Sequence, residues 1–516
     1  MAHIWDRLSG LTRRGHSPLA HEPILSTIHD LTVKTLQGRR HSVDELVQAL
    51  FGVVPHDDLA EHALDMLVDA GPRLWIDLDS ALRARVHGYS DARVIQAPAV
   101  QKMTNPLAVA LAACGRDGRG REEALKHPAM RVDPRLYPVL TIRTTDWVTA
   151  VQGRAERVLA GVLARADAGT LLAILPMAAR LHDRRRGQHA IVLVEDALLR
   201  ADDMTLAAVR ACDDPRGRRL AYQVCLEADR VDQRQLVAAA LHESDIVVQS
   251  RCAERLSAQA VSQRRPEVLD ELLDSASARV RVEALTALIQ LGRTESGPRL
   301  LDDKASMVRL TAQLAVRRAG ADPAELYRQR LVARPTHGVR GLLAGLGDCG
   351  TRADAELVIP YLGHPRPRVR AEAVRTLRRL GADADLTALL EDPAPVVVRN
   401  VVSSLRASGP GVPTDLLWTL IGPGNPRHVR RGAHRLLAEH ETWSRIKADL
   451  ILVTDSDDVL SRQARADLDV WRARDFTSVY RGPSATLLRD LETLIAKAET
   501  AIGADFARML RWIIRS

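Results

Sequence analysis

The stretch of residues 280–292, VRVEALTALIQLG, decides the fold of this chain. Residues 308–320, VRLTAQLAVRRAG, and residues 369–381, VRAEAVRTLRRLG, repeat its pattern: an apolar anchor, then Arg, an Ala four positions after the anchor, and a glycine twelve positions after it. Weaker copies extend the series to twelve anchors with an average spacing of about 31 residues, which indicates a repeat protein. The anchors are Gly120, Val151, Gly187, Gly217, Val248, Val280, Val308, Val339, Val369, Val398, Val429 and Val459.

Each repeat has the pattern of a helical hairpin. The anchor and the residues four and eight positions later share one face of a helix, and the middle one is small because neighbouring helices approach within about 8–10 Å there. The glycine supplies a left-handed residue that ends the helix. About 31 residues accommodate two helices and two short turns, which leaves no room for a sheet. A single hairpin cannot bury its apolar face, so the repeats must stack into an α-solenoid.

These repeats resemble HEAT repeats, because Val-Arg-x-x-Ala lies on the second helix and Leu-Gly ends it. They are most similar to the compact bacterial kind that is also called PBS-lyase HEAT-like. The resemblance covers roughly residues 90–516 and is strongest over 275–440. It implies an all-α superhelix with the first helices outside and the second helices lining the concave side. The Asp that often stands three residues before the anchor is found at Asp117, Asp214 and Asp245, so other groups must cap most of the remaining turns.

An arginine follows the anchor in eight of the twelve repeats and predicts a column of guanidiniums about 10 Å apart. The column consists of Arg121, Arg218, Arg281, Arg309, Arg340, Arg370, Arg399 and Arg430. Such a column could bind phosphates, since Arg forms bidentate contacts with them. Alternatively, each guanidinium bonds a carbonyl or carboxylate of a neighbouring repeat and buries its stem in the seam. Gln152, Gln188 and Gln249 replace the arginine in three repeats, which favours this structural ladder over a phosphate site.

We expect three regions along the chain: a helical module at 1–90, the repeat array at 91–480 and capping helices at 481–516. The capping helices are indicated by a long apolar stripe that closes the exposed end of a solenoid. Residues 4–14 combine Ile, Trp and Leu with three arginines, and we interpret them as a helix that packs on its own domain rather than on a membrane or a partner.

Within the N-terminal module, three helices are expected before residue 71, and the weak alternation at 73–78 indicates a short strand. Three helices and a strand are similar to a winged-helix pattern. The helix that would read DNA carries Asp57, Asp58, Glu61, Asp65 and Asp69. These acids would be repelled by a phosphate-lined groove, so the module is expected to be a helical cap or a protein-docking module.

The composition of the chain narrows the class of protein further. The chain has 516 residues, 46% of them hydrophobic and 27% charged, which is typical of a foldable globular protein. The net charge of +8 is spread along the chain, so no concentrated nucleic-acid footprint is apparent. No apolar run approaches the roughly 18 residues of a membrane span, and no signal peptide is recognisable. Five scattered cysteines fit a reducing compartment, so we expect the cytoplasm.

The chain lacks the short motifs of nucleotide, zinc-protease or thiol chemistry, and its histidines lack zinc spacing. His428, His434 and His440 are six residues apart and therefore point in different directions on a helix. We expect no metal, no cofactor and no small-molecule substrate.

One enzymatic interpretation rests on an analogy with another class of protein. Some DNA glycosylases of alkylated bases resemble HEAT-like solenoids, with tryptophans and an Asp in a basic concave groove. By that resemblance, Asp146 would stabilise positive charge developing on the sugar, and Trp147 would stack on the lesion. In the alternative interpretation, Trp147 fills a gap between repeats and Asp146 caps the helix behind it. The wide dispersion of the other tryptophans favours this alternative.

The sequence therefore predicts a non-catalytic scaffold or adaptor whose concave face binds a protein partner. Nucleic-acid binding, with alkyl-base glycosylase activity in one form, is the main alternative; a chromophore-lyase-like role is suggested only by the name of the repeat family. Concave arginines exposed in one continuous stripe would favour nucleic acid, whereas arginines buried in the seams would favour protein.

Overall fold

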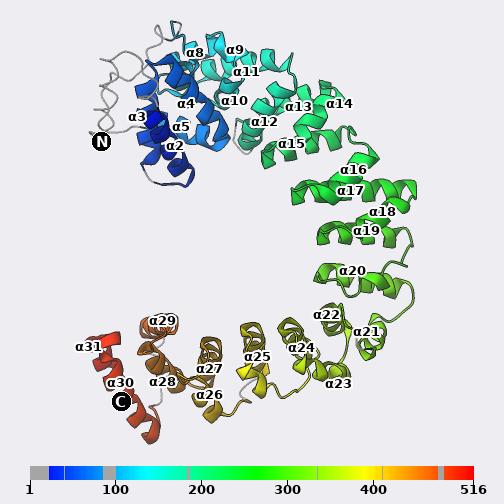
Figure 1. Ribbon diagram of the computed structural model, residues 1–516, viewed down its shortest axis with the longest axis vertical. Helices are drawn as coiled ribbons and strands as arrows, with labels where there is room; N and C mark the ends of the chain where they lie inside the picture. The colour runs from blue at the N-terminus through cyan, green and yellow to red at the C-terminus, as the bar shows by residue number, and fades with distance from the viewer. Residues whose placement is uncertain are drawn as a thin grey trace. The chain divides into compact units, whose positions relative to one another are not determined.

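The computed structural model describes residues 22–39, 41–84, 100, 102–182, 186–333, 335–408, 411–474 and 482–515. These residues form helices and connecting turns, with no strand among them (Figure 1). The chain is an all-α solenoid of helical hairpins, as predicted. It divides into two compact units, Met1–Leu256 and Ser257–Ser516. The amphipathic segment predicted at 4–14 lies outside the described residues.

In the described part of the first unit, four helices precede the repeats. They are α2 (Glu22–Leu36), α3 (Ser42–Val53), α4 (Asp57–Asp69) and α5 (Pro72–Arg83). The helices that follow are α7 (Pro106–Cys114), α8 (Gly118–Lys126), α9 (Ala129–Val132), the 3₁₀ helix η3 (Pro134–Leu136), α10 (Tyr137–Arg143), α11 (Thr149–Leu163), α12 (Ala168–Leu181), α13 (Gln188–Arg200), α14 (Asp203–Arg210), α15 (Pro215–Glu227), α16 (Gln233–His242) and α17 (Ile246–Gln263), in which the division between the units falls.

The second unit continues the alternation of first and second helices. Its first half contains α18 (Glu267–Leu272), α19 (Ala278–Gln290), η4 (Pro298–Leu300), α20 (Ser306–Arg318), α21 (Pro323–Val332), α22 (Val339–Cys349), η5 (Arg352–Asp354), α23 (Ala355–Val358), η6 (Ile359–Gly363) and α24 (Pro367–Arg379). Its second half contains η7 (Thr387–Glu391), α25 (Pro395–Ser408), α26 (Thr414–Leu420), α27 (Arg427–His440), α28 (Thr442–Val453), α29 (Asp458–Arg474), α30 (Ala485–Ile502) and α31 (Ala504–Arg515).

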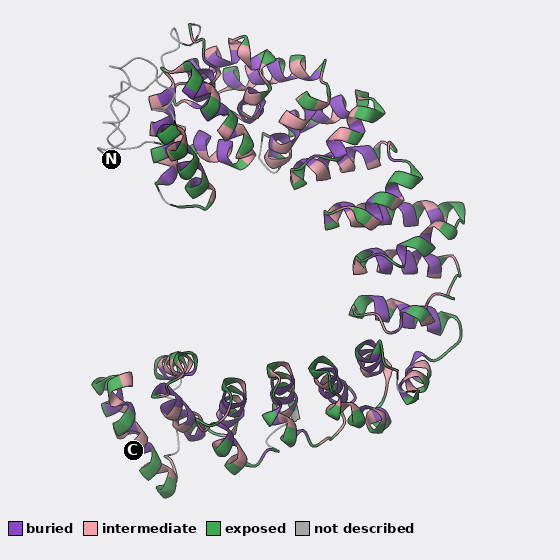
Figure 2. Ribbon diagram, in the orientation of Figure 1, coloured by how far each residue is buried: buried purple, intermediate pink, exposed green. Residues whose placement is uncertain are grey.

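The anchors mark the second helix of each repeat, as the sequence predicts. Each predicted anchor lies at the N-cap or in the first turn of a helix. In α19, Val280, Ala284 and Leu288 form one buried face, and the corresponding residues of α20 and α24 are buried too (Figure 2). The apolar core therefore lies between successive helices, where stacking removes this stripe from water.

The glycines end three of these helices in the predicted manner. Gly292, Gly320 and Gly381 have φ of +76°, +82° and +64°, respectively. After α19, the N–H of Arg293 donates to the carbonyl of Leu288 at 2.8 Å, and the N–H of Gly292 donates to that of Ile289. This pair of bonds is a Schellman motif, which a left-handed glycine makes sterically easy.

In four repeats the predicted anchor is out of register. The third residue of α13, α22, α25 and α29 is buried and holds the position that the anchor has in the other second helices. Of the four predicted anchors, Gly187, Val339 and Val398 are buried as well, and Val459 is exposed. These third residues are Ala190, Gly341, Val397 and Leu460. The turns before these helices differ in length, so a fixed spacing places the anchor one to three residues away.

The strand predicted at 73–78 was wrong, because these residues lie inside α5. Pro72 begins the helix, where its missing N–H costs nothing, and Leu74, Trp75 and Leu78 are buried. Alternation over six residues is too short to distinguish a strand from one helical face. Residues 73–78 therefore do not form the strand that the winged-helix pattern requires.

The acids on α4 face another part of the first unit. Arg135, in η3, forms ion pairs with Glu61 and Asp65 of α4 and with Asp133 of its own turn. Contacts of α4 with α7 and η3, and of α5 with α7 and α10, join the four N-terminal helices to the first repeats.

The second unit ends in two helices, of which α30 packs on α28 and α31 packs on α30. Gly503, with φ of +89°, separates α30 from α31, and Leu491, Ile495 and Phe506 are buried. None of the helices in the described part of the chain is both long enough and apolar enough to cross a bilayer.

Candidate binding surface

Six arginines occupy the fourth position of a second helix and share one set of contacts. They are Arg121 (α8), Arg218 (α15), Arg281 (α19), Arg309 (α20), Arg370 (α24) and Arg430 (α27). In the first five, the guanidinium donates to the carbonyl oxygens six and five residues earlier, in the turn that precedes its own helix. Arg430 donates instead to the carbonyl of Ile421. Each arginine side chain thus connects its own helix to the turn that precedes it.

Five of these guanidiniums also reach a carboxylate in the turn before the second helix of the following repeat. The pairs are Arg121–Asp146, Arg218–Glu243, Arg281–Asp303, Arg370–Asp392 and Arg430–Asp455. Arg281 is bidentate to Asp303, with both N–O distances at 2.8 Å. Every acid lies five residues before the third residue of the next second helix and accepts the N–H two residues after it. One carboxylate therefore joins two repeats and organises the turn between them.

The ion pairs lie in seams, and some of them shift the pKa of a member. The Arg430 guanidinium holds the pKa of Asp455 below its usual range, and Asp392 raises the pKa of Arg370. Burial alone would raise the pKa of Asp146, but the Val148 N–H and the Arg121 guanidinium outweigh it and lower that pKa. The positive charges of these arginines are therefore neutralised within the seams by carboxylates of the protein.

The structure separates the two residues nominated for base repair. Asp146 is fully enclosed, and its carboxylate accepts from Arg83, Arg121 and Arg143 at 2.9–3.0 Å. Trp147 is 69% exposed, so the expectation that it fills a gap between repeats was wrong. The Asp146 carboxylate accepts the Val148 N–H at 3.0 Å, just before α11. Asp146 holds the same repeat position as Asp303, and in this arrangement it does not reach solvent.

Two members of the predicted column lie elsewhere. Arg340 is the second residue of α22, its side chain is 52% exposed, and its Nε lies 3.3 Å from Glu372. Arg399 is the fifth residue of α25 and is exposed, because the buried positions before it belong to Val397 and Val398. The register shift of these two helices removes both arginines from the seam.

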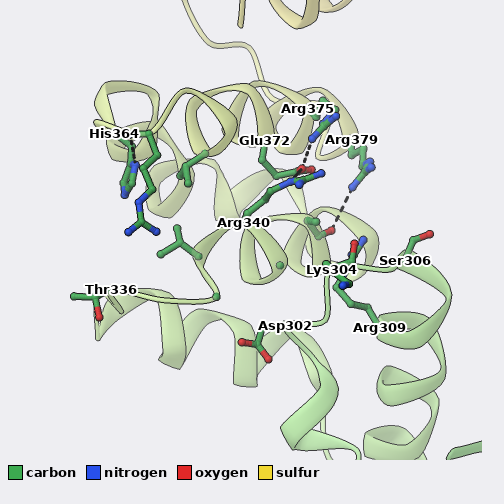
Figure 3. A pocket seen from close by; sticks show the side chains of 16 residues that line it. Asp302, Lys304, Ser306, Arg309, Thr336, Arg340, His364, Glu372, Arg375 and Arg379 are labelled. Carbon is green, nitrogen blue, oxygen red and sulfur yellow. Dashed lines mark hydrogen bonds and ion pairs between the residues drawn. The ribbon is translucent and has the colours of Figure 1, made fainter. Parts of the chain in front are cut away.

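The seam between α20 and α22 is also exceptional. Thr336 stands where the five seams described above have a carboxylate, and Arg309 pairs instead with Asp348 at the far end of α22, at 3.1 Å. Gly341 lies close to the backbone carbonyl of Asp302, so a Cβ there would collide with it. A cavity of about 380 Å³ opens here between the beginnings of α20, α22 and α24 (Figure 3).

The walls of this cavity are predominantly cationic. Lys304, Arg309, Arg340, Arg366, Arg375 and Arg379 line it, against the two acids Asp302 and Glu372. Glu372 is shared by Arg340 and Arg375 (Figure 3). Arg379 pairs with Asp348, which lies outside the lining of the cavity. Lys304 and Arg366 are exposed and form no ion pair within the described residues. Two cations are thus available, and the first turns of α22 and α24 add the positive ends of their dipoles.

Helix α20 also exposes an apolar stripe. Met307, Leu310 and Leu314 are 60%, 44% and 44% exposed and follow the spacing of one helical face. The cavity residues Ser306 and Arg309 belong to the same helix. One helix therefore presents apolar side chains to solvent and borders a cationic cavity.

Sequence reasoning missed the seam acids and the cavity cations. Asp146, Glu243 and Asp303 stand five residues before a predicted anchor and would have been detectable in the aligned repeats. Asp392 and Asp455 stand six and four residues before theirs, because those two repeats are out of register. Lys304, Arg366, Arg375 and Arg379 follow no common repeat position, so only the packing of α20, α22 and α24 brings them together.

Comparison with known proteins gave no family assignment. No family model matches the chain, and no curated protein matches its sequence. Among solved structures, the karyopherin Kap121p bound to the extreme C-terminus of the protein phosphatase Cdc14p is similar at 12% identity and a TM-score of 0.28, covering 95% of this chain and 55% of that one. The chain thus spans about half the length of Kap121p. A circular tandem repeat protein is similar at 14% identity and a TM-score of 0.12, with 96% and 90% covered.

Proposed function

We propose that this protein is a non-catalytic adaptor and that the cavity between α20, α22 and α24 is the centre of its partner-binding surface. The observation that carries the proposal is the difference in ion pairing between the seam arginines and two cations of the cavity. The seam arginines are neutralised by acids of the next repeat, whereas Lys304 and Arg366, beside the cavity, form no ion pair with the part of the chain that the structure describes.

The partner is proposed to be a protein segment that carries both acidic and aliphatic side chains. Carboxylates of the partner would complement Lys304 and Arg366, and aliphatic residues would cover Leu310 and Leu314. An exposed apolar stripe beside a charged pocket is the composition of a protein interface, with an apolar centre and a polar rim. The face of the second helices offers the length that a standard interface needs.

Nucleic acid is the second candidate, because the cavity has an excess of cations. A phosphate backbone, however, requires many exposed cations at regular intervals. The seam arginines do not provide such a row, since their guanidiniums are already bonded to carboxylates and carbonyls. The apolar stripe of α20 would also gain nothing from a phosphate backbone.

The finer features expected from the sequence belong to this proposal as well. They are the binding face as the concave one, the compact bacterial type of HEAT-like repeat, a cytoplasmic location, and the division into a module at 1–90, an array at 91–480 and a cap at 481–516. All five cysteines are unpaired, which supports a reducing compartment.

The test measures binding of a fluorescent peptide rich in Glu and Leu, and of duplex DNA, to the full chain by anisotropy. The peptide should bind, and Lys304→Glu with Arg366→Glu should weaken its binding by about tenfold or more. The matched control, Arg489→Glu with Lys497→Glu, reverses two exposed charges of α30 and should leave binding unchanged.

Two results would contradict the proposal. One is equal loss in both double variants, which would indicate a general charge effect. The other is DNA binding that exceeds peptide binding, falls steeply with salt and depends on Lys304 and Arg366; it would assign the cavity to nucleic acid.

A further inference from the structure

Three potential metal ligands come together in the second unit, one from each of three consecutive helices. His434 of α27, Asp449 of α28 and Asp467 of α29 place one ligand atom each within 4.8 Å of one another. The first two are buried and Asp467 is half-buried. Helix α28 packs against both α27 and α29, so the packing of the core sets the distances between the three side chains (Figure 1).

Asp449 has a carboxylate oxygen that the protein leaves unused. Its Oδ1 lies 2.6 Å from His434 Nε2, whereas its Oδ2 has no hydrogen-bond partner among the described residues, although the side chain is completely enclosed. Arg445 Nε, one turn earlier on α28, is 4.0 Å from Oδ2, beyond hydrogen-bond distance. Burial raises the pKa of Asp449. An enclosed oxygen without a donor is costly, and a cation beside it would remove that cost.

The other two side chains complete a donor set. No hydrogen bond to Asp467 is formed within the described residues, so its carboxylate is free to coordinate. Burial and three neighbouring arginines lower the pKa of Arg435. The negative charge of Asp467 acts in the opposite direction and raises that pKa. An imidazole with two carboxylates has a charge of −2 when the histidine is neutral, which a divalent cation cancels.

We propose that His434, Asp449 and Asp467 bind a divalent transition-metal cation, with Zn²⁺ and Mn²⁺ as the fitting ions. The imidazole favours a transition metal over Mg²⁺ or Ca²⁺, and three protein ligands leave at least one coordination position for water. Coordination through Nε2 requires that nitrogen to be unprotonated, so its proton moves to Nδ1 or is released to solvent. The bound ion would link α27, α28 and α29.

Sequence reasoning expected no metal, because it searched for ligands close together in the chain. His434 and Asp449 are 15 residues apart. Their approach depends on how three helices pack, and no short spacing reveals it.

The experiment uses the full chain after chelator treatment and removal of the chelator. Zn²⁺, Mn²⁺ and Mg²⁺ are titrated separately, with thermal unfolding and a competing zinc indicator as readouts. Zn²⁺ should bind with a stoichiometry near one and raise Tm, and Mg²⁺ should have little effect. Asp467→Asn should weaken Zn²⁺ binding by at least about tenfold and abolish the rise in Tm. Because Asp467 is half-buried, this variant should fold.

The matched control is Asp469→Asn, which removes an equal charge from the same helix, where Asp469 pairs with Arg465 and Arg472. It should bind Zn²⁺ like the wild type. The proposal is overturned if Zn²⁺ leaves the Tm of the wild type unchanged, or if Asp467→Asn binds as tightly as the control. The second result would assign the bound zinc to cysteines or surface histidines.

Discussion

Asp146 in the first unit and Asp392 in the second occupy the same position of the repeat, yet they bond to different numbers of arginines. Asp392 binds one guanidinium, that of Arg370. Asp146 binds three, since Arg83 from α5 and Arg143 from α10 join Arg121. A position that elsewhere joins two neighbouring repeats therefore also attaches an N-terminal helix at this seam. Asp79 of α5 strengthens the attachment through Arg83 and Arg143.

The largest effect is expected from Asp146→Asn. The substitution keeps the shape of the side chain but leaves the buried Arg121 without a carboxylate, and it leaves Arg83 and Arg143 with Asp79 alone, so we expect a loss of about 3–5 kcal/mol. Urea unfolding followed by circular dichroism measures the loss, and hydrogen exchange of α5 and α11 locates it. A loss below about 1 kcal/mol would contradict the role assigned to this carboxylate.

Asp392→Asn tests the ordinary seam and should have a smaller effect. It removes the charge from one bidentate pair whose members are both largely buried, and we expect a loss of about 2 kcal/mol. Exchange should increase in α24 and α25 while that of α5 stays unchanged. A loss equal to that of Asp146→Asn would remove the distinction between the two seams.

The pH dependence of stability sharpens the comparison between wild type and Asp146→Asn. The pKa of Asp146 is lowered in the folded chain, so its contribution is complete above the unfolded value of about 3.9 and is lost as pH falls through the lower folded value. The stability difference should therefore be constant near pH 6 and shrink below about pH 4. A gap that widens in acid would show that the folded pKa is raised instead.

Trp147→Ala should have the smallest effect, although Trp147 follows Asp146 directly. Its side chain is mostly exposed, so we expect a change within about 0.5 kcal/mol in the same urea experiment. A loss above about 2 kcal/mol would mean that the indole packs against the protein in solution.

The fold could be predicted because the features that define each repeat depend on residues close together in the sequence. The anchor of α19, the Ala four residues later and Gly292 fulfil their roles within one helix, and the structure confirms each of them. The strand predicted at 73–78 failed because six residues do not distinguish a strand from a helical face. The column was extended to Arg340 and Arg399 because a fixed spacing ignores the lengths of the turns.

The candidate sites were less accessible to such reasoning. The seam acids recur at one repeat position and could have been recognised, whereas the cavity depends on Thr336 replacing a seam acid and on Gly341 admitting the carbonyl of Asp302. Neither feature follows from the pattern of the repeat.

By itself, the sequence determined that this chain is a stack of helical hairpins, because helix periodicity, small residues at close contacts and left-handed glycines are properties of neighbouring residues. Only the tertiary structure decided which arginines are neutralised, where cations stay unpaired, and which His and Asp side chains meet. These outcomes depend on distances between residues on different helices, and such distances are set by how the helices pack.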